Sequence, residues 1–428
     1  MKNKFVFVLI LALILCGPLF AKGQAAPQPA AAASTTTLKW AMWDADLTIY
    51  YKPLIDAFQA KNPNIKIELV DLGSADFMTL ISTQLSGGAD LDIITIKDMP
   101  GYANLVRQNR LEPLNAFLKT KNISPAMYGG LLEQLTVNNE VYTLPFRSDF
   151  WLIYYNKDIF DKAGVAYPSN DMTLDQYDAL ARRLTSGSGA NKIYGAHYHG
   201  WRSATQLFGI LDGKNTVVGG NYDFLAPHYQ RVLKQQDDGI VMSLAAIRTS
   251  GTHYSGAFFN SQIAMMNMGS WFIATQIAQV AKGEASSKNW GLAKYPHPDG
   301  VPAGTTLGTL TGISVNRNST KKDAALSFIQ FVAGPEGALV LAGTGNFPAI
   351  MNQEVVNTIS SKPGFPADAN SKAALTVTKT YLEMPLHDKS ADIEVALNEI
   401  HDAIMTKNVS VADGIRQMNE RVKAILAK

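Results

Sequence analysis

The sequence predicts an α/β fold in which mainly parallel sheets are flanked by helices and a helical region ends the chain. Strand and helix patterns alternate between residues 38 and 96, as they do in parallel sheets. Two interruptions rich in proline or polar residues, near 144–148 and 295–309, divide the pattern. A 46% apolar content with 17% charged residues excludes intrinsic disorder, and 428 residues suffice for more than one core.

The amino-terminal elements follow from periodicity and from residues that end helices. Pro63 stops the first helix and Gly87-Gly88 ends the second. The predicted order is strand Leu38–Trp43, helix Tyr51–Asn62, strand Ile65–Val70, helix Phe77–Leu85 and strand Leu91–Ile96. Parallel strands present a ligand crevice at their carboxyl ends, where Trp43-Asp44 and Asp98 stand.

The later elements alternate less regularly. An aromatic strand over Val141–Asn156 comes first, and the carboxyl-terminal part from Lys321 is mostly helical. We expect helix in Asp158–Leu184, 204–212, 222–238, Lys322–Val332, Gly334–Gly343, Ser371–Met384 and Ser390–Lys428, and strands at Ile193–Tyr198, Ile263–Met268, Asn289–Tyr295 and Gly312–Asn316.

The first residues predict export. Lys2 and Lys4 precede an unbroken apolar run, Phe5–Cys16, and a small residue, Ala21, offers a cleavage site. A transmembrane anchor would need about 20 apolar residues. We therefore predict a signal peptide over 1–21, a flexible Ala/Pro/Thr leader over 22–37 and a periplasmic or extracytoplasmic protein.

Lipid attachment at Cys16 is the alternative to a free mature protein. The residue before a lipidated cysteine is usually small, and Leu15 is not, so we favour cleavage without lipidation. The mature chain then loses its only cysteine and two lysines, and its formal charge falls from +2 to zero.

Several classes of function are disfavoured. A charge of +2 without a basic block predicts no nucleic-acid partner, and a single cysteine builds no thiolate metal site. His197-x-His199 lacks a third ligand in recognisable spacing, and neither Gly187-x-Gly189 nor Gly343-x-Gly345 is followed by the Gly-Lys-Ser/Thr of a phosphate loop. We expect no metal, no cofactor and no enzyme activity.

Five stretches carry a resemblance to a known family. They are YYKPLIDAFQAKNPNIKIELV, LSGGADLDIITI, VYTLPFRSDFWLIYYNKDIFDKAGV, SQIAMMNMGSWF and GISVNRNSTKKDAALSFIQFVAGPEGALVLAGTGNFPA. In this order, behind a signal peptide, they resemble the family 1 extracellular solute-binding proteins of ATP-binding-cassette importers, in the sugar-binding group that includes maltose-binding protein.

The resemblance implies a two-lobed, type II-like periplasmic-binding-protein fold. Its lobes would comprise 38–146 plus 309–345 and 147–308 plus 346–428. A monomer of this kind captures a sugar or oligosaccharide by hinge closure and delivers it to membrane permease subunits. The alternative keeps the fold and binds a non-sugar solute such as a glycerol phosphodiester or polyamine. A third possibility, an exported glycan-degrading enzyme, needs two carboxylates about 5–10 Å apart.

A sugar site needs an aromatic plate and side chains that donate and accept hydrogen bonds. The resemblance implies an aromatic platform for the sugar at Trp271 of the Gly-Ser-Trp segment. The alternative is that Trp271 packs in the core. Trp43 and Asp44 end the first strand and are predicted ligand contacts. The alternatives are that Trp43 packs in the core and that Asp44 caps the next helix. Asp98, after the third strand, is a ligand contact or a cap.

The remaining candidates lie at the predicted crossings and in one loop. Arg147 and Asp149 contact the ligand or form a structural ion pair. Trp201 and Arg202 follow a loop of polar aromatics. Thr309 lies in a Gly-Thr-Leu-Thr-Gly stretch, and Asn346 at the third crossing contacts solute or forms a turn. Arg147 and Arg202 together would favour an anion, and Asp44, Asp98 and Asp149 together a cation.

Overall fold

The computed structural model describes residues 35–428 except 47, 74 and 75. The predicted signal peptide and residues 22–34 of the predicted leader lie outside the described residues. The end of that leader is not flexible as expected, because Thr36 and Thr37 already belong to the first strand and pair with Ile65 and Lys66. Their β-branched side chains suit an extended backbone.

The strands of the described residues form one sheet with the order β2-β1-β3-β8-β4-β6-β5, where β7 pairs with β4 and β9 with β8. Their bounds are β1 Thr36–Met42, β2 Ile65–Asp71, β3 Ile93–Ile96, β4 Leu144–Asn156, β5 Tyr194–His197, β6 Ile263–Gly269, β7 Trp290–Lys294, β8 Thr305–Val315 and β9 Lys379–Leu382. Ladders β1–β2, β1–β3, β5–β6 and β8–β9 are parallel, whereas β4 is antiparallel to all its partners.

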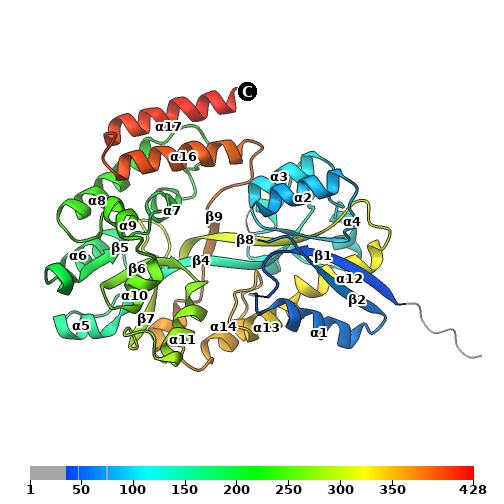
Figure 1. Ribbon diagram of the computed structural model, residues 1–428, viewed down its shortest axis with the longest axis horizontal. Coiled ribbons are helices and arrows are strands. Elements are labelled where there is room, and N and C mark those ends of the chain that lie inside the picture. The colour runs from blue at the N-terminus through cyan, green and yellow to red at the C-terminus, as the bar shows by residue number, and fades with distance from the viewer. Residues whose placement is uncertain (1–34, 47, 74–75) are drawn as a thin grey trace, which may run out of the picture. The chain divides into compact units, whose positions relative to one another are not determined.

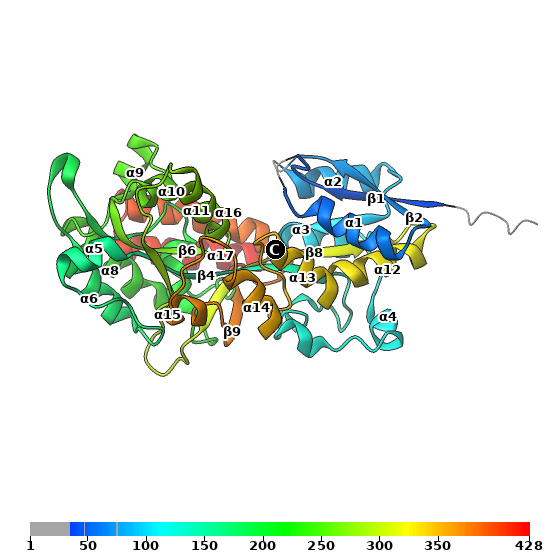
Figure 2. The ribbon, with the colours of Figure 1, turned by 90° about the horizontal axis from the view of Figure 1, so that it is seen from below.

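Helices cover both faces of the amino-terminal strands, with α2 and α3 on one side and α1, α12 and α13 on the other (Figures 1 and 2). The α-helices are α1 Tyr51–Lys61, α2 Phe77–Ser86, α3 Met99–Arg107, α4 Asn115–Thr120, α5 Lys157–Ala163, α6 Leu174–Leu184, α7 Ser203–Gln206, α8 Ala226–Asp237, α9 Leu244–Ser250, α10 Tyr254–Phe259, α11 Phe272–Lys282, α12 Lys322–Val332, α13 Pro335–Gly343, α14 Gln353–Ser360, α15 Ala369–Ala373, α16 Ser390–Met405 and α17 Val411–Leu426.

Strands β4 and β8 connect the two groups of elements. The first half of β4, Leu144–Phe150, pairs with β8, and its second half, Trp151–Asn156, pairs with β6 and β7. Nearly every residue of β4 is buried, which explains its unbroken apolar and aromatic character. The predicted α/β fold with a helical carboxyl-terminal region is confirmed.

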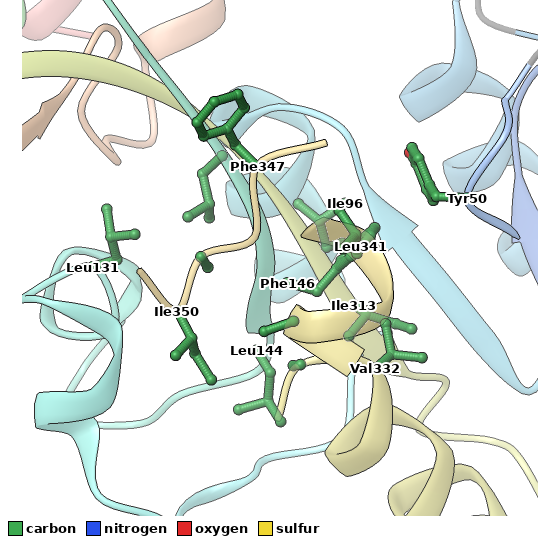
Figure 3. Packing of buried hydrophobic residues seen from close by; sticks show 14 of the residues in the cluster. Tyr50, Ile96, Leu131, Leu144, Phe146, Ile313, Val332, Leu341, Phe347 and Ile350 are labelled. Atoms are coloured by element: carbon green, nitrogen blue, oxygen red, sulfur yellow. The ribbon is translucent and has the colours of Figure 1, made fainter. Parts of the chain in front are cut away.

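Two hydrophobic clusters form the core. The side chains of the second half of β4 alternate between them, with Leu152 and Tyr154 in the first cluster and Trp151, Ile153 and Tyr155 in the second. Figure 3 shows side chains of the first cluster, in which β3, β4, β8, α12, α13 and the segment after α13 meet. Its labelled members are Tyr50, Ile96, Leu131, Leu144, Phe146, Ile313, Val332, Leu341, Phe347 and Ile350. The segment after α13 runs beside β4, since the Ser148 N–H donates to the Phe347 carbonyl oxygen at 3.1 Å.

The helix predicted over Ser371–Met384 is wrong. Helix α15 ends at Ala373, and Lys379–Leu382 forms β9 on the edge of β8. Three threonines at alternate positions, 376, 378 and 380, favour an extended chain, and β8 supplies the pairing partner. Strand β8 itself begins at Thr305, seven residues before the predicted Gly312.

Helices α16 and α17 pack against each other at the end of the chain (Figure 1). Across the part of the chain that the structure describes, no single helix has the length and apolar composition of a membrane span. Only α12 and α13 taken together have them, and that pair is bent by 55° at its junction.

Candidate ligand-binding site

A pocket of about 430 Å³ lies beside the crossing strands and helix α16, a volume within the range of small-molecule sites. Four predicted residues line it: Trp201, Arg202, Trp271 and Thr309. The other lining residues are Trp151, Gly200, Ser203, Arg248, Glu383, Glu394, Asn398, His401 and Asp402.

The aromatic wall of the pocket consists of Trp151, Trp201 and Trp271. Trp201 follows β5 and Trp271 follows β6, and the carboxyl ends of these parallel strands meet at one edge of the sheet. The Trp271 ring lies edge-on to both others, with centroids 5.8 Å from Trp151 and 6.3 Å from Trp201. Trp201 is 40% exposed, so its ring offers free apolar surface.

A glycine at the end of β6 sets the position of Trp271. A Cβ atom at Gly269 would lie 2.0 Å from Cζ3 of the Trp271 ring. The indole therefore folds back over the backbone where no side chain blocks it. The Met-Gly-Ser-Trp segment thus places an aromatic ring at the pocket for a steric reason.

The floor of the pocket comes from β4, β8 and the residue after β9. Thr309 is the one exposed residue of β8, and it pairs with Asp149. The Glu383 N–H donates to the Gly308 carbonyl oxygen at 3.1 Å, and the Glu383 carboxylate accepts a hydrogen bond from the Trp151 Nε1–H. Burial raises the pKa of Glu383 to about 7, although the Trp151 hydrogen bond and the positive charge of Arg202 oppose the shift.

Two ion pairs line the remaining side. Arg202 is 5% exposed, and its Nη2 lies 2.9 Å from Oε1 of Glu394. Arg248 Nη2 lies 2.5 Å from Oδ1 of Asp402. Each arginine in the pocket thus has a carboxylate partner, and neither is available as an uncompensated charge.

A smaller cavity of about 130 Å³ adjoins the pocket and shares Arg202, Thr309, Glu383 and Glu394 with it. Its other side is the loop between β3 and α3, including Asp98. Asp98 caps α3, because its Oδ1 accepts from the Gly101 N–H at 2.7 Å. The surrounding cavity wall raises the pKa of Asp98 by desolvation. The predicted cap is therefore present, and the ligand contact of Asp98 stays a prediction.

Trp43 and Asp44 do not line the pocket. The Trp43 ring packs edge-to-face on Phe77, with centroids 5.0 Å apart. Asp44 lies in a turn with φ 51°, and its backbone N–H donates to Oδ1 of Asp71 at 3.0 Å. Asp71 also accepts from the Gly73 and Ala45 N–H groups, which lower its pKa. Asp44 is not the expected cap, since α1 begins after Tyr50.

Arg147, Asp149 and Asn346 also lie outside the pocket lining. Arg147 Nη2 is 2.7 Å from Oδ2 of Asp149, whose Oδ1 accepts from the Ser270 Oγ–H at 2.8 Å. Both residues belong to β4, so the ion pair lies within one strand, and the Ser270 hydrogen bond links it to the end of β6. The geometry is that of the predicted alternative, a structural ion pair. Asn346 Nδ2 donates to Thr344 Oγ1 at 2.9 Å, which fits the turn role.

Sequence reasoning missed the contribution of α16. Glu394, Asn398 and Asp402 recur every four residues, so they share one helix face. His401 lies beside them in a run of buried apolar residues. This polar stripe beside the buried face of α16 was the available signal. The stripe indicates a binding site only once the fold places α16 beside the crossing strands.

The predicted histidine pair, His197 and His199, lies outside the pocket lining. Within the described residues, no group of three His, Cys, Asp or Glu side chains could hold a metal ion. His197 is fully buried, which lowers its pKa to about 3 and keeps the ring neutral.

Comparisons with known proteins agree with this architecture. A crystal structure described as a sugar transporter from Rhizobium etli, in an open conformation, is 59% identical, with TM-score 0.88, covering 91% of this chain and 100% of that one. The sugar-binding protein MalE of Xanthomonas citri has the same fold at 17% identity, with TM-score 0.74, covering 92% and 98%. The mannitol-binding protein of Pseudomonas aeruginosa is 23% identical over 340 residues, 75% of this chain and 74% of the relative.

The match to a family profile covers most of the chain. The profile described as "Bacterial extracellular solute-binding protein" matches residues 44–339, which include all strands from β2 to β8. Family and fold are those of binding proteins, with two lobes joined by crossing strands. The chain belongs to the bacterial extracellular solute-binding protein family.

Proposed function

We propose that the chain is the substrate-binding component of an ATP-binding-cassette importer and that it captures a sugar or oligosaccharide. The observation that carries the proposal is a pocket with three tryptophans on one side and two neutralised ion pairs on the other. Indole rings cover the apolar C–H face of a sugar, while carboxylates and guanidinium groups bond its hydroxyls. The similar sugar transporter and mannitol-binding protein support this choice of ligand.

The charge arrangement argues for an uncharged ligand. Arg202 and Arg248 are paired with Glu394 and Asp402, so an anionic solute would have to compete with a carboxylate. A polyamine would in turn compete with the arginines. A neutral polyol inserts hydroxyls without displacing either partner, which favours the sugar over a phosphodiester or polyamine.

We propose that the ligand site combines Trp151, Trp201, Trp271, Arg202 and Thr309 with Asp98 on the opposite side. Asp98 precedes α3, whereas the tryptophans belong to β4 and the loops after β5 and β6. Contacts from both sides stabilise a closed arrangement, so the ligand shifts a hinge equilibrium. We place the lobe boundaries at the crossings, with 38–146 plus 309–345 in one lobe and 147–308 plus 346–428 in the other.

The exported protein would be a monomer that presents its closed form to permease subunits, without nucleic-acid partners. We propose cleavage after Ala21, without lipid at Cys16. Sequencing of the mature amino terminus then begins at Lys22. A mature chain that begins at a lipid-modified Cys16 would overturn this part.

The test is calorimetric titration with mannitol, lactose, maltose and larger oligosaccharides, alongside glycerol phosphodiesters and polyamines. We expect saturable heat and a raised melting temperature with at least one sugar. Binding only of the charged solutes would refute the sugar assignment. Incubation with a bound oligosaccharide should leave it intact, whereas shortened products would show that the chain is an enzyme.

A further inference from the structure

A buried series of hydrogen bonds joins two residues of the pocket through residues that do not line it. Arg202 Nη1 donates to Oε1 of Gln206 at 3.3 Å, and Gln206 Nε2 donates to the Tyr229 hydroxyl at 2.8 Å. That hydroxyl lies 3.1 Å from Nδ1 of His401. All four side chains are at most 5% exposed, so water does not substitute for any of these partners.

The chemistry of arginine gives this series a direction. A guanidinium group has only donors, so the Gln206 amide must present its oxygen to Arg202. The amide then has only its NH₂ group left for Tyr229. The Tyr229 oxygen therefore accepts a hydrogen bond from Gln206, and the orientation of the amide is determined by the charge at one end of the series.

The tautomer of His401 follows from the same count. Tyr229 has one hydroxyl hydrogen, and Nδ1 of His401 is the acceptor beside it. A proton on Nδ1 would leave the Tyr229 hydrogen buried without an acceptor, which is strongly disfavoured. The single proton of the neutral ring therefore resides on Nε2. Burial, together with the charges of Arg202 and Arg248, lowers the pKa of His401 to about 3, so the ring is neutral at pH 7.

We infer that His401 is a specificity-determining donor in the pocket and that Gln206 and Tyr229 are positioning residues that hold its proton on Nε2. This inference rests on the proposed function and names the chemistry of one subsite: the ligand must place an oxygen acceptor opposite Nε2. Asp402 and Glu394 line the same pocket and are acceptors. A hydroxyl suits such a subsite, because it accepts from His401 while donating its own hydrogen to a carboxylate.

The tautomer is measured without any ligand. In ¹⁵N-histidine-labelled protein at pH 7, a long-range ¹H–¹⁵N correlation distinguishes protonated from unprotonated ring nitrogens, and the His401→Gln variant identifies the His401 signals by their loss. We expect a proton on Nε2 alone. Tyr229→Phe should shift the ring toward a mixture of tautomers, whereas Tyr128→Phe, a buried tyrosine bonded to the Ala333 carbonyl oxygen at 3.0 Å, should not. A proton on Nδ1, or on both nitrogens, would overturn the inference.

The ligand role is tested with whichever of mannitol, lactose and maltose binds most tightly. His401→Leu should weaken binding by about 2- to 10-fold, the range of one neutral hydrogen bond. His401→Gln retains an N–H near the Nε2 position and should recover most of that loss. Tyr229→Phe should cost about twofold, because half of the ring population would lack the donor.

The two proposals fail in different ways. If no sugar binds while the Nε2 tautomer is observed, the sugar assignment fails and the ordered series stands. If a sugar binds normally to His401→Leu, and if its binding to the parent protein leaves the His401 Nε2 signal unmoved, His401 is not a ligand donor although the sugar function holds.

Discussion

Replacing Trp201 by alanine should separate ligand binding from folding. Trp201 is 40% exposed and lines the pocket, and its ring contacts His199 edge-on at a centroid distance of 4.6 Å. A buried aromatic side chain covers about 150–250 Å², so the exposed part of Trp201 offers a ligand on the order of 60–100 Å².

The magnitude follows from that area. At about 25 cal/mol per Å², covering it contributes about 1.5–2.5 kcal/mol to binding. Trp201→Ala should therefore raise the Kd of the best-binding sugar by about 10- to 60-fold. The free energy of unfolding should fall by only about 1 kcal/mol, from lost aromatic contacts. Calorimetric titration and urea unfolding measure the two quantities.

Tyr167 provides a matched control. It is 43% exposed and does not line the pocket, and its hydroxyl donates to Oδ1 of Asp161 at 2.7 Å. Tyr167→Ala should leave the Kd unchanged. The reasoning is refuted if Trp201→Ala binds sugar like the parent protein, or if Tyr167→Ala weakens binding as much.

Three further variants test other parts of the site. The pKa of Glu383 rises from 4.5 to about 7 on folding, so the folded protein holds a proton that the unfolded chain releases. The free energy of unfolding should therefore fall by on the order of 2–3 kcal/mol as the pH increases from 4.5 to 7. Glu383→Gln should remove that part of the dependence in urea unfolding at pH 5 and pH 8, and an unchanged pH profile would contradict it. Asp149→Asn removes the partner of Arg147 and should lower the free energy of unfolding by about 2–4 kcal/mol with little effect on Kd, whereas weaker sugar binding at unchanged stability would return the pair to the ligand site. Gly269→Ala should displace the Trp271 ring and weaken sugar binding by about tenfold. The control is Gly343→Ala, where an added Cβ meets nothing within 4 Å and binding should not change. Equal Kd values for the two variants would show that the space at Gly269 does not position the Trp271 ring.

The amino-terminal elements could be predicted because their signals are local. Periodicity, Pro63 and Gly87 mark α1, β2 and α2 within a few residues. Strand β9 could not be predicted in this way. Its four residues become a strand because β8 offers a free edge, and that edge exists only after the chain has folded back.

The candidate site likewise contains residues that local sequence signals predict and residues whose roles depend on the folded chain. Trp271 was predicted from the end of its strand and Trp201 from its loop of polar aromatics, and both line the pocket. The position at a strand end also selected Trp43, but its ring packs on Phe77 instead. A strand end gives the edge of the sheet and not the direction of the side chain. Glu383 and His401 were missed, since their roles depend on contacts with Trp151 and Tyr229 far away in the chain.

The most direct test of the central claim is the identity of the natural ligand. Protein purified from its native host should be unfolded, and the released small molecules should be identified by mass spectrometry, with Trp201→Ala protein as the control. We predict a neutral sugar or sugar alcohol in stoichiometric amount with the parent protein and a reduced amount with the variant. A phosphorylated solute or a polyamine, retained equally by both proteins, would contradict the account of a tryptophan-lined, charge-neutralised sugar site.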